Sequence, residues 1–466
     1  MDDAFIGRLL LGLNPQDVEE ARRAALADRV AAYFAANEKI EYIGVAGIGR
    51  HGGALLFQEH DEAKHPTRKI IIKYSLNAQA DADLRNEAHW LEMLRGSEHI
   101  GKLIDLNDPN LDITGSGKRP TLALEFIPHG PIRIWRERME RTPPPNRLLW
   151  RIYLCLIRQV VAMKYPMRGP NDGPLVRETI RQDVAPAGIT QNSGHYDNFI
   201  IGDIEPSVPG DEHGLVPVIK LIDFGRGVGD PENWLEADQI NLASAAYLML
   251  IITLPQISMQ EIIEEQQFGA SMYQYTPRGS TTPVQFETSA VGYFTQAWCV
   301  DDDLKTLVAR CGALDGQHIP TVEEALEVCE NAVRYKTGEN IQAFGKEQDP
   351  EAFIRSETDE MINRIVQKTM LDADVIPEVP SGQLPTNTAV DNAIFDFLVR
   401  KAPGFGQMGT TLLGLRPPVR VKKGSTRPTP EEKLTAYQKY LISVRERYNI
   451  EITEEQMANA GYRGDS

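Results

Sequence analysis

Residues 216–225 are VPVIKLIDFG, an apolar run that ends in an acidic residue, an aromatic residue and a glycine. The run predicts a short buried strand with Asp223 at its end. An earlier apolar segment, HYDNFIIG at residues 195–202, carries Asn198 near its start. Amide and carboxylate oxygens are hard ligands that suit Mg²⁺. The two segments therefore predict that Asn198 and Asp223 converge on a magnesium ion that bridges phosphates.

A glycine-rich segment with the spacing Gly47-x-Gly49-x-x-Gly52 lies between two strand-like runs, YIGVAGIG and GGALLFQE. The spacing alone is a weak signal, since a dinucleotide-binding unit would need a strand, these glycines and then a helix. Between two strands, the glycines instead favour a hairpin whose backbone N–H groups cover phosphates. A glycine-rich hairpin without a ligand is the plain alternative.

Two further segments carry polar groups in apolar surroundings. Lys73 lies inside KIIIKYSL, where an ammonium group is costly unless a countercharge is near. The next predicted helix supplies Glu87, and we expect the two to pair, unless Lys73 reaches solvent. Residues 122–130, LALEFIPHG, predict a strand that leads into a turn. The main chain of this turn can offer donors and acceptors to an adenine ring, or the turn is an ordinary exit from a strand.

In chain order, these features resemble the protein-kinase superfamily over about residues 40–335, and most of all the divergent kinase-like proteins of filamentous fungi. The resemblance implies an α+β, bilobal fold that binds ATP and Mg²⁺. It implies that Lys73 holds the α- and β-phosphates, that Glu87 orients Lys73, and that Asn198 and Asp223 are the metal ligands. The other nucleotide contacts would come from the glycine-rich loop and the turn after the strand: Gly47, Gly49, Gly52, Ala54, Glu125 and Ile127.

The catalytic loop departs from the family pattern. The family has an aspartate five positions before the metal-binding asparagine, and this position holds Ser193 here. A serine cannot accept a proton at neutral pH as a carboxylate does, and the loss of a general base costs about 10²–10⁴-fold in rate. The sequence offers two substitutes, Asp197 beside Asn198 and Asp183 in RQDVAP, and His195 is a weaker third.

The segment after Asp223 is also short, with 15 residues from Asp223 to Asp238 and no sign of the platform on which protein kinases dock peptides. We therefore predict a domain that binds ATP–Mg²⁺ with weak or absent phosphoryl transfer, which is a pseudokinase with a scaffold or regulatory role. The alternative is an active kinase that phosphorylates a protein Ser or Thr or a small-molecule hydroxyl. A third reading is a relic of the fold that binds no nucleotide.

The chain divides into four parts by the character of its sequence. Residues 1–39 predict a helical extension, residues 40–130 a small β-rich lobe, and residues 131–335 a helical lobe. Residues 336–466 predict a partly ordered helical extension, because stretches rich in Pro and Gly separate its helical segments. A protein partner, if there is one, is expected to use this C-terminal extension.

Periodicity predicts the remaining elements. Short strands are expected at residues 99–106 and 121–127, and residues 165–190 should form a long loop or insertion. Helices are expected at residues 15–38, 80–96, 147–164, 349–371, 388–402 and 430–448, and they should dominate residues 238–335.

Composition excludes several classes of protein. The chain has 466 residues, 42% apolar and 25% charged, which is enough for a sizeable core. Its 49 Lys and Arg against 66 Asp and Glu give a net charge of −17, so no nucleic-acid partner is expected. The N-terminus lacks a basic, signal-like region, and the longest apolar run, Ile240 to Leu254, is shorter than the ~20 residues that a membrane span needs. A buried core helix and a cytoplasmic or nuclear location are expected.

The four cysteines are widely separated and include no CxxC pair. No zinc or redox motif is therefore visible, and four separate thiols in a reducing compartment are expected. The residues concerned are Cys155, Cys299, Cys311 and Cys329.

Overall fold

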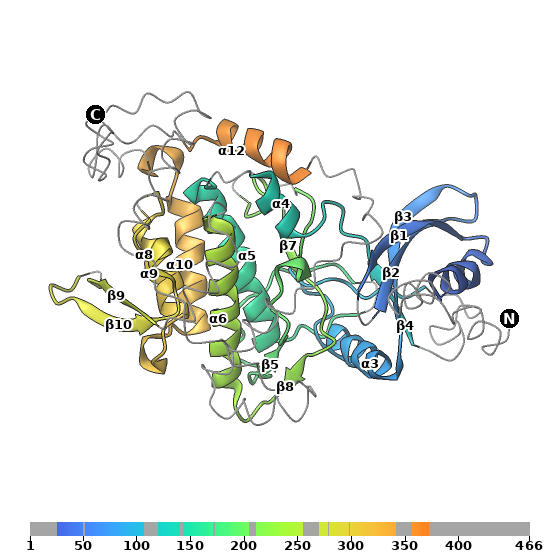
Figure 1. Ribbon diagram of the computed structural model, residues 1–466, viewed down its shortest axis with the longest axis horizontal. Helices are drawn as coiled ribbons and strands as arrows, with labels where there is room; N and C mark the ends of the chain where they lie inside the picture. Colours follow the sequence, from blue (N-terminus) through green and yellow to red (C-terminus); the bar gives the residue numbers. More distant parts are fainter. Residues whose placement is uncertain are drawn as a thin grey trace, which may run out of the picture.

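The protein has two lobes that follow one another along the chain, a sheet-containing lobe and a helical lobe (Figure 1). The predicted α+β, bilobal architecture is thus confirmed. The computed structural model describes residues 26–49, 52–106, 120–139, 143–170, 173–204, 211–254, 270–277, 279–297, 299–341 and 357–371.

The small lobe is an antiparallel sheet in the order β1-β2-β3-β4. A helix at residues 26–35 packs on one face, where its apolar side chains share a core with Leu55, Phe57, Ile70 and Ile72. The other face carries α3, which the Asn77 side chain caps by accepting from the Ala80 N–H. The elements are β1 (Ile40–Ile48), β2 (Gly52–His60), β3 (Pro66–Ser75), α3 (Ala78–Met93) and β4 (Thr121–Glu125).

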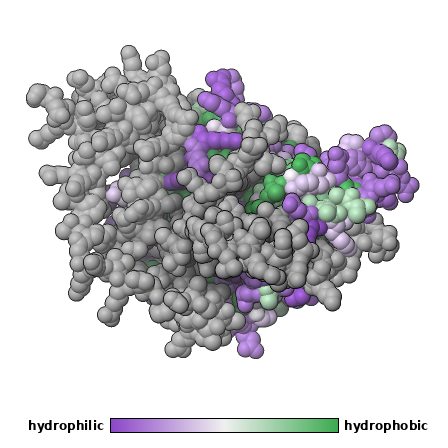
Figure 2. Space-filling view, turned by 45° about the vertical axis from the view of Figure 1, so that its right-hand side comes forward, coloured by the Kyte–Doolittle hydropathy of each residue, from purple (hydrophilic) through white to green (hydrophobic). Residues whose placement is uncertain are grey.

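β1 is the edge strand of this sheet and exposes three apolar side chains, Tyr42, Ile43 and Val45. Figure 2 shows hydrophobic patches beside hydrophilic residues on the face that includes this end of the molecule. The opposite edge strand, β4, leads directly into the second lobe.

The helical lobe is built around two buried helices, α5 (Asn146–Lys164) and α6 (Trp234–Thr253). By length and hydropathy α6 could cross a membrane, but 78% of its apolar window is buried inside the protein. The predicted core helix is therefore confirmed. The smaller helices of this lobe are α4 (Ile132–Arg138), α8 (Gly292–Thr295), α9 (Asp302–Cys311), η2 (Gly316–His318) and α10 (Val322–Tyr335).

Two short ribbons lie between α5 and α6 in the sequence and carry the polar loops. In the first, β6 (Phe199–Ile201) follows the turn η1 (Tyr196–Asn198) and pairs with β7 (Ile219–Leu221). In the second, β5 (Ile189–Thr190) pairs with β8 (Val228–Gly229). Because Phe199 is opposite Leu221, Asn198 and Asp223 lie at the same end of the first ribbon.

One prediction of secondary structure was wrong, and two others were incomplete. Residues 99–106 form isolated bridges at Ile100 and Leu103 rather than a strand, because the chain there crosses between the lobes and pairs with each only once. Helices dominate the described residues of 238–335, as predicted. The region also contains an antiparallel hairpin, β9 (Ser271–Tyr275) with β10 (Val284–Thr288), whose aromatic side chains pack on each other.

The helix expected at 349–371 is confirmed in part. In its described part, a helix starts at Asp359, after the N-cap Thr358, and comprises α12 (Asp359–Val366) and η3 (Gln367–Leu371). The helices expected at residues 388–402 and 430–448 lie outside the described residues.

Residues 357–371 pack against the helical lobe. Ile362, Val366 and Met370 belong to its hydrophobic core, and the Trp135 indole of α4 donates to the Thr369 hydroxyl at 3.1 Å. This part of the predicted C-terminal extension is therefore joined to the core of the domain before it.

Candidate functional site between the two lobes

Lys73 lies near the end of β3, opposite Ala54 of β2 and Leu122 of β4. Its neighbours Ile72 and Tyr74 point into the core beneath the helix at residues 26–35. Since successive side chains of a strand point to opposite faces, Lys73 points to the other face, where α3 lies.

The Lys73 ammonium joins two carboxylates from different lobes. Its Nζ lies 2.6 Å from Glu87 Oε2 on α3 and 3.0 Å from Asp223 Oδ1, which follows β7. The predicted pairing of Lys73 with Glu87 is confirmed. The second contact, with Asp223, ties the small lobe to the ribbon of the large lobe.

The three charges shift one another's ionisation. Burial lowers the pKa of Lys73, but the charges of Asp223 and Glu87 outweigh it and raise the pKa above its usual value. Burial would raise the pKa of Asp223, but the Lys73 ammonium holds it below the usual range. Burial raises the pKa of Glu87 to about 7, with Lys73 opposing and Asp223 reinforcing the effect. One cation therefore serves two carboxylates, of which only Glu87 is fully buried, and the three groups together carry a net negative charge when both carboxylates are ionised.

The backbone presents Asp223 in an uncommon conformation. Its φ is +64°, in the left-handed region that costs energy for a non-glycine residue. The Gln191 side chain stabilises this turn by donating to the carbonyl oxygens of Ile222 and Asp223 at 3.0 and 2.8 Å. The Asp223 side chain is 41% exposed, so a ligand can reach its carboxylate. Strain of this kind is typical of functional sites.

Asn198 is oriented by Ser193. The Asn198 Nδ2 group donates to the Ser193 carbonyl oxygen at 2.7 Å and to its hydroxyl at 3.0 Å. With the amide nitrogen held in this way, the Oδ1 atom points elsewhere, and no described residue donates to it. The Ile222 N–H donates to the Asn198 carbonyl at 2.9 Å, which holds the residue beside Asp223. The metal-ligand roles of Asn198 and Asp223 remain predictions that this arrangement suits.

The two substitute bases have other partners. The Asp197 carboxylate lies 2.7 Å from Arg133. Burial would raise the pKa of Asp197, but His195 and Arg133 outweigh it and hold the pKa below the usual range. The Asp183 side chain is 79% exposed and lies 3.9 Å from Arg181. A carboxylate that holds its protons weakly and is paired with a guanidinium is a poor proton acceptor. Among these candidates, Ser193 is the one whose side chain accepts from the Asn198 side chain in the described residues.

The glycine-rich segment forms the turn between β1 and β2, as predicted. The Gly49 N–H donates to the Gly52 carbonyl at 2.8 Å, and the two residues between them lie outside the described residues. Gly52 is also required by the sheet, since an added Cβ would lie 2.3 Å from the Tyr74 carbonyl oxygen. Gly47 has open space around it. Phosphate binding by these glycines stays a prediction.

The strand exit after β4 keeps its main chain accessible. The Glu125 carboxylate accepts from Lys220 Nζ at 2.8 and 2.9 Å and from the Lys102 N–H at 2.7 Å. Within the described residues, the Ile127 N–H donates to no other group. An adenine ring could thus bind the Ile127 main chain, whereas the Glu125 side chain is already engaged.

A contact that sequence analysis missed holds α3 in place. The Asn86 side chain donates to the carbonyls of Gly225 and Gly227, and the Trp90 indole donates to Gly227 at 3.0 Å. An added Cβ at Gly229 would lie 2.5 Å from the Trp90 ring. The segment after Asp223 therefore packs along α3 and keeps Glu87 near Lys73. The repeated glycines of GRGVG were the available signal.

No protein-family profile matches the sequence, and no curated protein matches it. Among solved structures, the chain is similar to a chain in the structure of the CAK complex from Chaetomium thermophilum bound to ATP-γ-S. The identity is 17% and the TM-score 0.42, and the match covers 67% of this chain and 93% of that chain. The case for a function therefore depends on the geometry of the site.

Proposed function

We propose that the site formed by Lys73, Glu87 and Asp223 between the two lobes binds ATP with Mg²⁺, and that phosphoryl transfer from it is slow or absent. The observation that carries the proposal is the position of Lys73 between Glu87 and Asp223, at 2.6 and 3.0 Å. A lysine held by two carboxylates from different lobes, one of them partly exposed, suits the recognition of a phosphate chain and its metal ion.

The donor set fits a magnesium ion. Asp223 supplies a carboxylate that a ligand can reach, and Asn198 supplies an amide oxygen whose orientation Ser193 fixes. These two residues would hold Mg²⁺, which neutralises phosphate charge when bound. Lys73 would contact phosphate oxygens, and Glu87 would keep its ammonium in place. The turn from Gly47 to Gly52 would cover the phosphates with its backbone.

The proposal of slow transfer depends on Ser193. The Ser193 hydroxyl contacts Asn198, and the resemblance to kinases would place an aspartate at position 193. No described carboxylate contacts Ser193. Without a base, the substrate hydroxyl loses its proton with difficulty, which corresponds to a loss of about 10²–10⁴-fold. A pseudokinase with a scaffold or regulatory role follows.

An active phosphotransferase is the second candidate, and the intact trio of Lys73, Glu87 and Asp223 favours it. Positioning and charge neutralisation supply most of the catalysis in phosphoryl transfer, so a missing base need not abolish it. The substrate would be a protein Ser or Thr or a small-molecule hydroxyl.

Thermal unfolding of the full chain with and without Mg²⁺–ATP tests the proposal. A nucleotide at 100 times its Kd should stabilise the wild type by about 2.7 kcal/mol, seen as a rise in Tm. Asp223→Asn should remove most of this rise, whereas the exposed Glu232→Gln should keep it. No rise in the wild type overturns nucleotide binding, and an equal rise in Asp223→Asn overturns the assignment of the metal site.

A further inference from the structure

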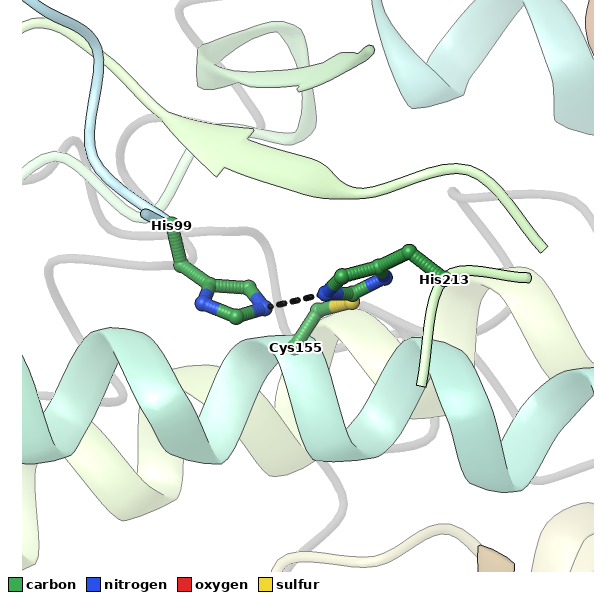
Figure 3. A group of neighbouring side chains, drawn as sticks. All are labelled: His99, Cys155 and His213. Atoms are coloured by element: carbon green, nitrogen blue, oxygen red, sulfur yellow. Dashed lines mark hydrogen bonds between the residues drawn. The ribbon is translucent and has the colours of Figure 1, made fainter. Parts of the chain in front are cut away.

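Three potential metal ligands meet in the core of the helical lobe, and none of them belongs to the site of Lys73, Glu87 and Asp223. His99 lies in the loop after α3, Cys155 in the middle of α5, and His213 in the loop before β7. Their ligand atoms all lie within 4.8 Å of one another. Figure 3 shows the two imidazole rings meeting above α5, with the Cys155 sulfur beside the His213 ring. The three residues are at most 2% exposed.

The spacing of the two rings suits a shared ion. His99 Nε2 and His213 Nε2 are 3.1 Å apart. Two imidazole nitrogens bound tetrahedrally to zinc at 2.0–2.1 Å would be about 3.3–3.4 Å apart, so a shift of a few tenths of an ångström is enough.

A buried carboxylate orients the first ring. Glu178 Oε2 lies 2.6 Å from His99 Nδ1, and its Oε1 accepts from the His99 N–H at 2.9 Å. A carboxylate that accepts from one nitrogen of an imidazole leaves the lone pair of the other for a metal ion. This carboxylate–histidine arrangement commonly surrounds protein-bound zinc.

The charges near the cluster are compatible with a dication. A Cys155 thiolate and the Glu178 carboxylate together balance a charge of +2, so the metal-bound cluster would be neutral overall. The nearby arginines are compensated by acidic partners: Arg177 pairs with Glu98 and Asp211, and Arg158 pairs with Glu212 and Glu330.

We propose that His99, Cys155 and His213 bind a zinc ion, with Glu178 as the outer carboxylate that orients His99. Two imidazoles and a thiolate are ligands that zinc prefers over magnesium or calcium. Binding releases the thiol proton and the proton shared by the two rings. The ion links the loop after α3, α5 and the loop before β7 into one unit.

One strand would connect the zinc site to the site of Lys73, Glu87 and Asp223. The Leu221 N–H donates to the His99 carbonyl at 2.9 Å, and Leu221 ends the strand that leads to Asp223. The metal-free alternative is a hydrogen-bonded core cluster, in which a proton lies between the rings and His99 pairs with Glu178.

Metal content of the full chain distinguishes the two. The protein is stripped with a chelator, incubated with Zn²⁺ and passed through gel filtration, and bound zinc is measured by mass spectrometry. The wild type should retain about one zinc ion per chain, as three protein ligands form one site. Cys155→Ser and His213→Gln should retain almost none, and Cys299→Ser, outside the cluster, should match the wild type. Glu178→Gln should weaken zinc binding about 10–100-fold.

Cobalt gives a second measurement that does not depend on the variants folding. Co²⁺ added to the stripped wild type should produce a thiolate-to-cobalt charge-transfer band in the near ultraviolet, which Zn²⁺ then removes. A wild type that shows no such band and retains no zinc overturns the proposal. Zinc retention equal in the wild type and in folded Cys155→Ser and His213→Gln overturns it too.

Discussion

At the scale of single residues, several lysines of the described part of the chain lie between two carboxylates, and in two of these groups the pKa of one carboxylate is raised. Lys73 pairs with Glu87 and Asp223, and Lys164 pairs with Asp238 at 2.8 Å and with Glu323 at 2.9 Å. In each of these two groups one cation offsets two acidic side chains, at least one of which is buried, so that side chain holds a proton more tightly than it would in water.

Ser193 is the residue that we expect to limit transfer. Ser193→Asp should place a carboxylate beside Asn198 and raise the rate of phosphoryl transfer by up to about 10²–10⁴-fold. Ser193→Asn is the matched control, since an asparagine side chain has the size of aspartate but cannot accept a proton. The measurement is turnover of Mg²⁺–ATP at equal enzyme concentration. Equal rates in the two variants, or wild-type rates near the ~1–100 s⁻¹ of kinases, would contradict the expected role.

Asp238 should make stability depend on pH. Burial raises the pKa of Asp238 to about 6, with Lys164 opposing, whereas an unfolded aspartate ionises near pH ~4. The folded state thus keeps this proton to higher pH, and its contribution to stability is complete below about pH 4 and lost as the pH rises through 6.

Asp238→Asn removes the carboxyl group that takes up this proton, so position 238 no longer makes stability depend on pH. Relative to the variant, the wild type should lose on the order of 3 kcal/mol of unfolding free energy between pH 4 and pH 7. Urea unfolding over that range measures the difference. If the difference in unfolding free energy between the wild type and Asp238→Asn stays constant with pH, the pKa of Asp238 is the same in the folded and unfolded states.

At the scale of elements, α3 and the segment from Gly225 to Gly229 form one packed unit. The indole of Trp90 lies over Gly227 and Gly229, and Asn86 binds two of the carbonyls. The segment is thus held by contacts within the domain.

Gly227→Ala tests this packing. Its Cβ would lie 2.6 Å from Trp90 Cδ1 and 3.0 Å from the Phe224 carbonyl oxygen, so α3 or the segment must move. We expect a loss of about 1–3 kcal/mol in the free energy of unfolding, as for other overpacked sites. Gly44→Ala in β1 is the control, since its Cβ would have open space. Urea unfolding that gives the same loss for both would rule out the tight packing.

At the scale of the whole molecule, the C-terminal segment stabilises a helix from the middle of the chain. α5 begins after Pro145 without a side-chain cap from its own N-terminus. Glu357 supplies one, because its carboxylate accepts from the backbone N–H groups of Asn146 and Arg147 at 2.9 and 2.8 Å. A negative charge at this end also complements the helix dipole.

Glu357→Ala should therefore leave two partly buried N–H groups without this partner and cost about 1–3 kcal/mol of unfolding free energy. The control is Glu360→Ala, whose side chain is 84% exposed and pairs with Arg364 on the surface. That change should stay within about 0.5 kcal/mol. Thermal or urea unfolding of both variants gives the comparison, and a similar small effect in both would contradict a capping role.

Periodicity and local chemistry in the sequence predicted much of the fold. The strand-like apolar runs predicted the strands of the small lobe, and the apolar run after Asp238 predicted the buried helix α6. The pairing of Lys73 with Glu87 was predictable as well, since an ammonium in an apolar strand needs a nearby carboxylate and the next helix has one. The hairpin of β9 and β10 was missed, because its strands are short and contain few apolar residues.

The tertiary structure decided what depends on residues far apart in the chain. It brought Asp223 to Lys73, Trp90 to Gly227, Glu357 to the start of α5, and Cys155 to His99 and His213. The sequence showed no zinc motif, since a motif is a local spacing and these ligands come from three separate segments. Local patterns set which strands and helices form, but such contacts depend on how those elements pack, which no short window of sequence contains.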